Sequence, residues 1–265
     1  MTFTNAGKMF AVVLCATSVI IVAVLQTYLS HDGTELVEYY YSLTVPSQNE
    51  KVVSIVFDDG WKTQLDTVPI LDRYGFKATF AIITSYAGSR PAYMDWDQIQ
   101  KLASNQHDIE CHSLNHVSLN NVSEDVLVRE LEESKKILRE HGFDSELFIY
   151  PFGDGYDNTT VKNCVSTHYL AARCLNATKY NLDTGHRYMI TSYGIENDTS
   201  MEDFVSYVQG ASGGLIAVIY YHQIGEGNAS TIIPLSKFEE EMAYLNATGY
   251  SVRTLRELLF RPSTK

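Results

Sequence analysis

The chain has 265 residues, of which 45% are hydrophobic, and a formal net charge of −12 at pH 7. Such a length can bury one sizeable core, and a single domain of about 230 residues lies within the usual size range. The acidic balance argues against nucleic acid as a partner, because nucleic-acid binding needs a basic surface.

Residues 9–29 are predicted to form a transmembrane signal anchor. Residues 9–25, MFAVVLCATSVIIVAVL, carry no charge, and about twenty apolar residues suffice to cross a bilayer. Lys8 precedes the segment and acidic residues follow it, so residues 1–8 are expected in the cytoplasm and the rest of the chain outside. A cleaved signal peptide, which would leave a secreted protein, is the alternative, although no small-x-small site follows. The polar residues 30–50 are predicted to be a stalk.

Two further features agree with export to the cell surface or the secretory lumen. Six N-x-S/T sequons are candidate surface glycosylation sites. They begin at Asn121, Asn158, Asn176, Asn197, Asn228 and Asn246. Cys164 and Cys174 lie ten residues apart and can form one disulfide outside the cell, whereas Cys111 is expected to be a small buried residue.

From residue 51 onward, short apolar runs alternate with helical patterns. Strands are predicted in the runs KVVSIVF (51–57), ATFAIIT (78–84), DIEC (108–111), ELFIYPFG (146–153), YLAARCL (169–175), RYMITSYG (187–194) and GGLIAVIYYH (213–222). Helices are predicted over 63–75, 94–103, 123–142 and 236–249. Seven or eight strands alternating with helices indicate a mostly parallel sheet, and this number in one domain favours a distorted (β/α) barrel over residues 51–260.

Five titratable residues follow predicted strands. Asp58 and Asp59 follow the first strand, His112 and His116 follow the third, and His222 ends the long apolar strand. In a (β/α) barrel, chemistry gathers at the carboxyl ends of the strands, so these side chains are expected to converge. Taken singly, Asp-Asp-Gly is typical of an ordinary turn, and a lone histidine at a strand end is more often a core residue.

Two histidines and one carboxylate can hold one divalent metal ion and leave a position open for water. Zinc would lower the pKa of that water towards about 7. A second carboxylate can then accept a proton, and a histidine from another strand can protonate a leaving group. This set of residues is typical of metal-assisted hydrolysis.

Four motifs occur in the order in which the polysaccharide deacetylase family has them. They are SIVFDDGWKTQLDTVPILDRYGFKATFAIIT, HDIECHSLNHVSL, FIYPFG and VIYYHQIG, and FEEEMAYLNATGYSVRTLRELL is similar to a common ending of these domains. The sequence therefore resembles the NodB-homology domains of that family, also called carbohydrate esterase family 4, which include deacetylases of chitin, peptidoglycan and poly-N-acetylglucosamine.

The resemblance implies a role for each of the five residues. Asp59, His112 and His116 would bind Zn²⁺, or another divalent cation such as Co²⁺ or Ni²⁺. Asp58 would be the general base and His222 the general acid. The loop formed by Pro151, Phe152 and Gly153 would contribute the backbone N–H of Phe152 to the oxyanion site.

The chain departs from the family pattern at two places. Many members have Arg-Pro-Pro-Tyr-Gly in the loop, where the arginine orients the catalytic aspartate. Here Ile149 and Tyr150 stand in place of the arginine and the first proline, a version similar to the branch that acts on poly-N-acetylglucosamine. The acidic motif that pairs with the catalytic histidine is also not evident; Asp183 and Arg187 are candidates for it, and exposed loop residues are the alternative.

Aromatic residues stand beside the predicted site. Trp61, Tyr150 and Tyr221 are candidate contacts for sugar rings, and core packing is the alternative for each.

The predicted function is the metal-dependent removal of N-acetyl groups from the amino sugars of a polysaccharide, by a domain that the N-terminal segment anchors to a membrane. One alternative is an O-acetyl esterase acting on a glycan such as acetylated xylan. Another is a surface protein that binds carbohydrate through a degenerate site. The sequence leaves the glycan and the oligomeric state undetermined.

Overall fold

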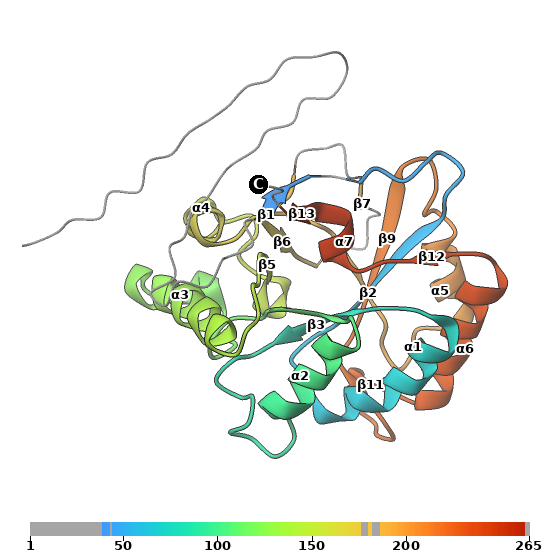
Figure 1. Ribbon diagram of the computed structural model, residues 1–265, viewed down its shortest axis with the longest axis horizontal. Coiled ribbons are helices and arrows are strands. Elements are labelled where there is room, and N and C mark those ends of the chain that lie inside the picture. Colours follow the sequence, from blue (N-terminus) through green and yellow to red (C-terminus); the bar gives the residue numbers. More distant parts are fainter. Residues whose placement is uncertain (1–38, 43, 176–179, 182–185, 263–265) are drawn as a thin grey trace, which may run out of the picture.

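The computed structural model describes residues 39–42, 44–175, 180–181 and 186–262. Nine strands form one curled sheet, drawn in Figure 1, with the order β6-β5-β4-β3-β2-β9-β7, to which β12 adds beside β2 and β8 beside β9. The bounds are β2 Val52–Phe57, β3 Thr79–Ile82, β4 Asp108–Cys111, β5 Leu147–Ile149, β6 Ala171–Arg173, β7 Tyr180–Asn181, β8 Tyr193–Gly194, β9 Leu215–Tyr221 and β12 Ser251–Val252. All pairs in it are parallel except that of β7 with β9.

Residues 190–194 connect the two sides of the curled sheet. Ile190 forms a parallel bridge to Arg173 on β6, and Tyr193 pairs with Ile219 on β9. The sheet thus forms the distorted (β/α) barrel predicted from the strand order, although several of its strands are only two or three residues long.

Helices cover the outside of the sheet, as Figure 1 shows. The helical segments of the described chain are η1 Lys62–Thr67, α1 Val68–Tyr74, α2 Trp96–Ser104, η2 Leu119–Asn121, α3 Glu124–Glu140, η3 Pro151–Gly153, α4 Thr159–His168, α5 Met201–Val208, α6 Leu235–Ala247 and α7 Leu255–Leu259, of which η3 and α7 lie at the ends of the barrel. A short pair, β10 Gln223–Ile224 and β11 Ile232–Ile233, follows the long strand β9.

Alternation along the strands sorts the buried side chains into two sets. On β9, Ile216, Val218 and Tyr220 belong to the inner cluster of the barrel, whereas Ala217, Ile219 and Tyr221 belong to the cluster under the helices. The same alternation holds on β2 and β5. Because each strand is covered on both faces, its sequence is a continuous apolar run.

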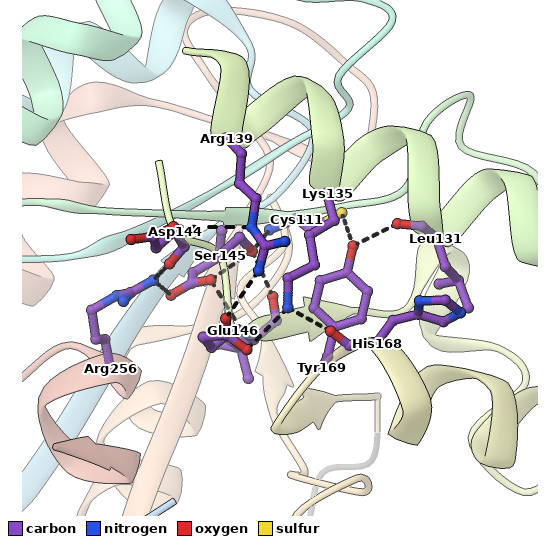
Figure 2. Close-up of polar contacts among 12 residues, drawn as sticks. Cys111, Leu131, Lys135, Arg139, Asp144, Ser145, Glu146, His168, Tyr169 and Arg256 are labelled. Carbon is purple, nitrogen blue, oxygen red and sulfur yellow. Dashed lines mark hydrogen bonds and ion pairs between the residues drawn. The ribbon is translucent and has the colours of Figure 1, made fainter. Parts of the chain in front are cut away.

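The end of the barrel opposite the candidate site is filled by α7. Leu255, Leu258 and Leu259 enter the inner cluster, and Arg256 forms ion pairs with Asp108 and Glu110 on β4. Buried charged and polar groups continue outward from this point to α3, as Figure 2 shows. At this end of the sheet Glu146 pairs with Lys135 and Glu110 pairs with Arg256, as buried charges require.

Part of the predicted stalk packs on the domain. β1, Tyr39–Tyr41, pairs antiparallel with β13, Phe260–Pro262, which directly follows α7. The ordered fold therefore begins before residue 51. The predicted cytoplasmic tail, residues 1–8, and the predicted anchor, residues 9–29, lie outside the described residues. Among the helices that the structure describes, none is long and apolar enough to cross a membrane.

The predicted disulfide between Cys164 and Cys174 is not formed, and both residues are free thiols. Cys164 lies on α4, where Glu124 and Glu132 of α3 are its charged neighbours. Cys174 follows β6 and is fully buried next to Tyr150. The two sulfur atoms thus have different neighbours, which their proximity in sequence does not reveal. Cys111 is buried, as predicted, and burial raises the pKa of its thiol to about 11.

Candidate metal centre and active site

Asp58 and Asp59 leave the end of β2 in different directions. Asp59 has a left-handed backbone with φ 74°, and both carboxylates are almost fully buried. Its Oδ1 lies 3.3 Å from Nε2 of His112 and 3.3 Å from Nε2 of His116. Its Oδ2 accepts a hydrogen bond of 2.8 Å from the indole N–H of Trp61. One oxygen of Asp59 therefore faces the two histidines while the other is held by an aromatic side chain.

The two histidines present the same ring nitrogen to Asp59. His112 directly follows β4, and its Nδ1 lies 2.8 Å from the carbonyl oxygen of Ile149, a contact in which Nδ1 carries the proton. In the neutral ring, this leaves the lone pair of Nε2 for a metal ion. Burial, followed by the proximity of His112, lowers the pKa of His116 to about 4. His116 is thus neutral near pH 7, which is the form that binds metals.

A buried glutamate holds the turn between the two histidines. Glu130 on α3 is 1% exposed, and its carboxylate accepts hydrogen bonds from the backbone N–H groups of Leu114 and Asn115 and from the Asn115 amide. The Ser113 hydroxyl accepts from the backbone N–H of His116. These contacts fix where the His116 ring can lie, in the manner of groups that orient metal ligands.

Asp59, His112 and His116 fit a divalent metal ion by geometry and by chemistry. Their ligand atoms all lie within 4.8 Å of one another. Ligands about 2.1 Å from a tetrahedral zinc ion are roughly 3.4 Å apart, close to the 3.3 Å between the Asp59 oxygen and each histidine nitrogen. That buried oxygen has no hydrogen-bond donor among the described residues. An acceptor buried without a donor is costly, and a cation would satisfy it.

Residues with a left-handed backbone conformation are concentrated at this centre. Of five non-glycine residues with positive φ in the described chain, four are Asp59, Ser113, His116 and Phe152. Such conformations cost of order 1–3 kcal/mol each and persist where the surroundings over-determine them, as at functional sites.

His222 and Asp58 are joined through one glutamine. The Gln64 amide on η1 donates to the carbonyl oxygens of Asp58, at 2.6 Å, and of His222, at 2.8 Å. Gln64 is fully buried, so it ties the ends of β2 and β9 together where both candidate catalytic residues emerge. His222 also lies close enough to Asp59 and His116 to influence their pKa values. All five predicted residues therefore meet at one rim of the barrel.

Asp58 has an arginine partner that comes from β6. Arg173 is fully buried, and its Nη2 forms an ion pair and a hydrogen bond with Oδ1 of Asp58. Its guanidinium carbon lies 4.7 Å from the ring centroid of Tyr220. The loop position holds Ile149 in place of the family's arginine, and the cation that pairs with Asp58 comes from β6 instead.

The loop after β5 lies against His116. Phe152 is 59% exposed, and its ring centroid is 4.4 Å from that of His116. Gly153 is required here, because a Cβ at this position would lie 1.8 Å from the side chain of Leu175. The loop therefore presents an exposed aromatic face at the rim of the site.

On another side, Trp61 continues into an aromatic stack. Its ring packs on Tyr93 with a centroid distance of 4.2 Å, and Tyr86 meets Tyr93 edge-on at 4.9 Å. Burial, followed by the charge of Asp59, raises the pKa of Tyr93 to about 12, so its hydroxyl stays protonated.

The other two predicted sugar contacts are buried in the layer between the sheet and the helices. Tyr221 is fully buried, and its hydroxyl donates to Glu241 on α6. Tyr150 is fully buried beside Phe148. A ring with no exposed face cannot pack on a sugar. The alternation of side chains along each strand explains the burial, because it turns both rings towards the helices.

Among the described residues, no acidic side chain is found in an ion pair with His222. Asp183 lies outside the described residues, and the guanidinium of Arg187 packs against Tyr41 and Tyr188. Arg173, Glu130 and Gln64 were not predicted as site residues. Strand alternation, which places Arg173 on the same face as Ala171, was the one signal that pointed to any of them.

Known proteins are similar to this chain in sequence and in fold. Residues 46–172 match the polysaccharide deacetylase family. The Bacillus subtilis protein YxkH, assigned as a polysaccharide deacetylase, is 32% identical over 124 residues, 46% of this chain and 43% of its own length. A peptidoglycan-N-acetylglucosamine deacetylase of Bacillus cereus is 26% identical over 227 residues, 83% of this chain and 93% of its own. The Xyl-CE4 domain of a multidomain xylanase from the Trinervitermes trinervoides hindgut metagenome has a TM-score of 0.57 at 26% identity, covering 79% of this chain and 90% of that one.

The residues at the rim of the barrel form a candidate metal site, and the similarities to known proteins indicate its kind. Residues 46–172 match the polysaccharide deacetylase family and contain Asp58, Asp59, His112 and His116, while His222 lies beyond the matched part. The predicted family and its enzyme class are confirmed.

Proposed function

We propose that this protein removes N-acetyl groups from the amino sugars of a polysaccharide, releasing acetate and leaving a free amine. One observation carries the proposal: Asp59, His112 and His116 form a metal-binding set, and a second carboxylate and a third histidine stand at the same rim. The similarity to a peptidoglycan-N-acetylglucosamine deacetylase over nearly its whole length supports an N-acetylated substrate.

Asp59, His112 and His116 would hold the metal, which is Zn²⁺ or a similar divalent cation. When bound, such an ion acts as a Lewis acid and lowers the pKa of water. The protein's own groups do the rest. Asp58 accepts the proton of the water that attacks the amide carbonyl carbon. The backbone N–H of Phe152 donates to the oxygen that gains negative charge.

His222 completes the reaction by proton transfer. As the bond between carbon and nitrogen breaks, the protonated imidazole donates its proton to the departing nitrogen, which leaves as the amine. Trp61 and the exposed ring of Phe152 flank the centre and are suited to contact the sugar, because aromatic faces pack well on apolar ring surfaces.

An O-acetyl esterase is the second candidate, favoured by the similarity to the xylanase-associated Xyl-CE4 domain. The same residues would serve, because water attacks an ester carbonyl in the same way. A carbohydrate-binding protein with a degenerate site is less well supported, since all five reacting and ligating residues are present and Asp58 retains an arginine partner.

We also propose that residues 9–29 anchor the protein in a membrane with the catalytic domain on the extracytoplasmic side. The apolar run and its flanking charges support this arrangement. The sequon asparagines Asn121, Asn197, Asn228 and Asn246 are exposed, as glycosylation would require. Asn158 is occupied otherwise, because its side chain caps α4.

The test is acetate release by the purified full-length chain in detergent, from N-acetylglucosamine oligomers and from acetylated xylan. Each reaction is run after chelation and again with zinc restored. We expect zinc-dependent acetate from the amino sugar. Release from xylan alone would transfer the assignment to an esterase, and no release from either by folded, zinc-loaded protein would contradict both.

A further inference from the structure

We propose that Arg173 is the positioning residue for the general base Asp58, and that β6 supplies the arginine that the loop after β5 lacks. This inference rests on the proposed function. It concerns a residue outside the four sequence motifs, on a strand that carries no other part of the site.

The strand register explains how an arginine on β6 can serve. β5 and β6 are parallel, and Arg173 is the direct partner of Ile149, the residue at the expected arginine position. Neighbouring strands lie about 4.8 Å apart, and directly paired residues point to the same face. Ile149 and the ring under Arg173, Tyr220, both belong to the inner cluster. A guanidinium from either strand can therefore enter the same part of the barrel.

The surroundings of Arg173 give it one anionic partner. The side chain is fully buried, Asp58 is the carboxylate it pairs with, and its Nε and Nη1 have no hydrogen-bond acceptor among the described residues. Burying a cation with so few partners is costly. An arginine retained mainly for stability would be expected to have more of its five donors satisfied.

The contact also determines which oxygen of Asp58 is free. Arg173 occupies Oδ1, so Oδ2 is left to accept the proton from the attacking water. Tyr220 supports the guanidinium from below, and its own hydroxyl lies so close to Gly194 that a Cβ there would come within 2.5 Å of it. Tyr220 and Arg173 thus hold the carboxylate in one orientation.

The experiment relocates the arginine. Full-length Arg173→Met, Ile149→Arg with Arg173→Met, and the control Arg187→Met are compared with wild type for kcat, KM and bound zinc. Arg187 is another arginine near β6, but it packs on Tyr41 and Tyr188 away from the site. We expect Arg173→Met to lower kcat about 100-fold with zinc content and KM nearly unchanged, because misplacing a reacting group by about 1 Å can cost this much. In the variant with Ile149→Arg and Arg173→Met, kcat should be at least tenfold higher than in Arg173→Met alone. The control Arg187→Met should have the wild-type kcat.

A second rescue covers the case in which the relocated variant does not fold. Low millimolar guanidinium chloride should raise the kcat of Arg173→Ala and leave wild type unchanged. The proposal is overturned if Arg173→Met keeps the wild-type kcat, or if neither a folded relocation variant nor added guanidinium restores turnover.

The midpoint of thermal unfolding, Tm, tests the contact between Arg173 and Asp58 without relying on enzymatic activity. Arg173→Met should change Tm differently in wild type and in an Asp58→Asn background, because the two side chains are in contact. An identical change in both backgrounds overturns the proposal, whether or not wild type releases acetate. A wild type without acetate release, by contrast, contradicts the proposed function itself.

Discussion

Variants of Asp58 and His112 distinguish the loss of the general base from the loss of a metal ligand. Asp58→Asn keeps the shape of the side chain but removes the base, so turnover should be lost while zinc stays bound. His112→Ala removes a ligand, and both zinc and turnover should be lost. Zinc content by atomic emission, measured beside acetate release, checks both expectations. Substantial activity in either variant would contradict the assignment of these residues.

Trp61 should affect the metal through Asp59. Its indole N–H holds Oδ2 of the carboxylate, and groups that orient metal ligands are typically worth 10–100-fold in affinity. Trp61→Phe keeps an aromatic ring on Tyr93 but removes the donor, so zinc affinity should fall by about tenfold or more. Tyr93→Leu is the matched control, because it removes the stack and leaves the hydrogen bond. Equal zinc affinities for the two variants, by competition with a chromophoric chelator, would refute this role.

Helix α3 acts on the metal centre through Glu130. Its carboxylate holds two backbone N–H groups of the turn that carries His116. Glu130→Ala should free this turn and weaken zinc binding by about 10–100-fold. Glu133→Ala, on the exposed face of the same helix, should leave it unchanged. A wild-type zinc affinity for folded Glu130→Ala would show that the turn keeps its shape without the carboxylate.

Helix α6 should make stability depend on pH through Glu241. Burial raises the pKa of this carboxyl to about 7, above the value of about 4.5 expected in the unfolded chain. The folded state then holds its proton more tightly, so the free energy of unfolding should fall as pH rises from about 4.5 to 7 and level off above that. The loss should approach about 3 kcal/mol.

The comparison of Glu241→Gln with Glu240→Gln tests this dependence. Glu241→Gln retains an acceptor for the Tyr221 hydroxyl and should lose that part of the pH dependence, while Glu240→Gln, one residue away and exposed, should behave as wild type. Urea unfolding midpoints at pH 5 and pH 8 measure the difference. Parallel pH profiles for Glu241→Gln and wild type would contradict the assignment.

For the whole molecule, metal binding should add to fold stability. The ligands come from the ends of β2 and β4, and a ligand that binds only the folded state stabilises it by about 2.7 kcal/mol at 100 times its Kd. Chelation should therefore lower Tm, and added zinc should restore it. His112→Ala should show neither change, and a zinc-dependent rise in its Tm would place the stabilising ion elsewhere.

The sequence alone determined the barrel, the family and the five residues at its rim. Apolar strands alternating with helices leave few architectures, and a polar residue directly after a buried strand must emerge at that strand's carboxyl end. These are local properties, readable from a few neighbouring residues. The same alternation would have turned Tyr150 and Tyr221 towards the helices, had it been applied to them.

The tertiary structure alone decided which partners hold those five residues. Arg173 meets Asp58 across 115 positions of sequence, and Gln64 reaches His222 across 158. The absence of a disulfide between Cys164 and Cys174, ten residues apart, has the same origin. Curling the sheet brings distant strand ends together and separates near neighbours into different layers, so a contact depends on how the strands are ordered and paired rather than on spacing along the chain.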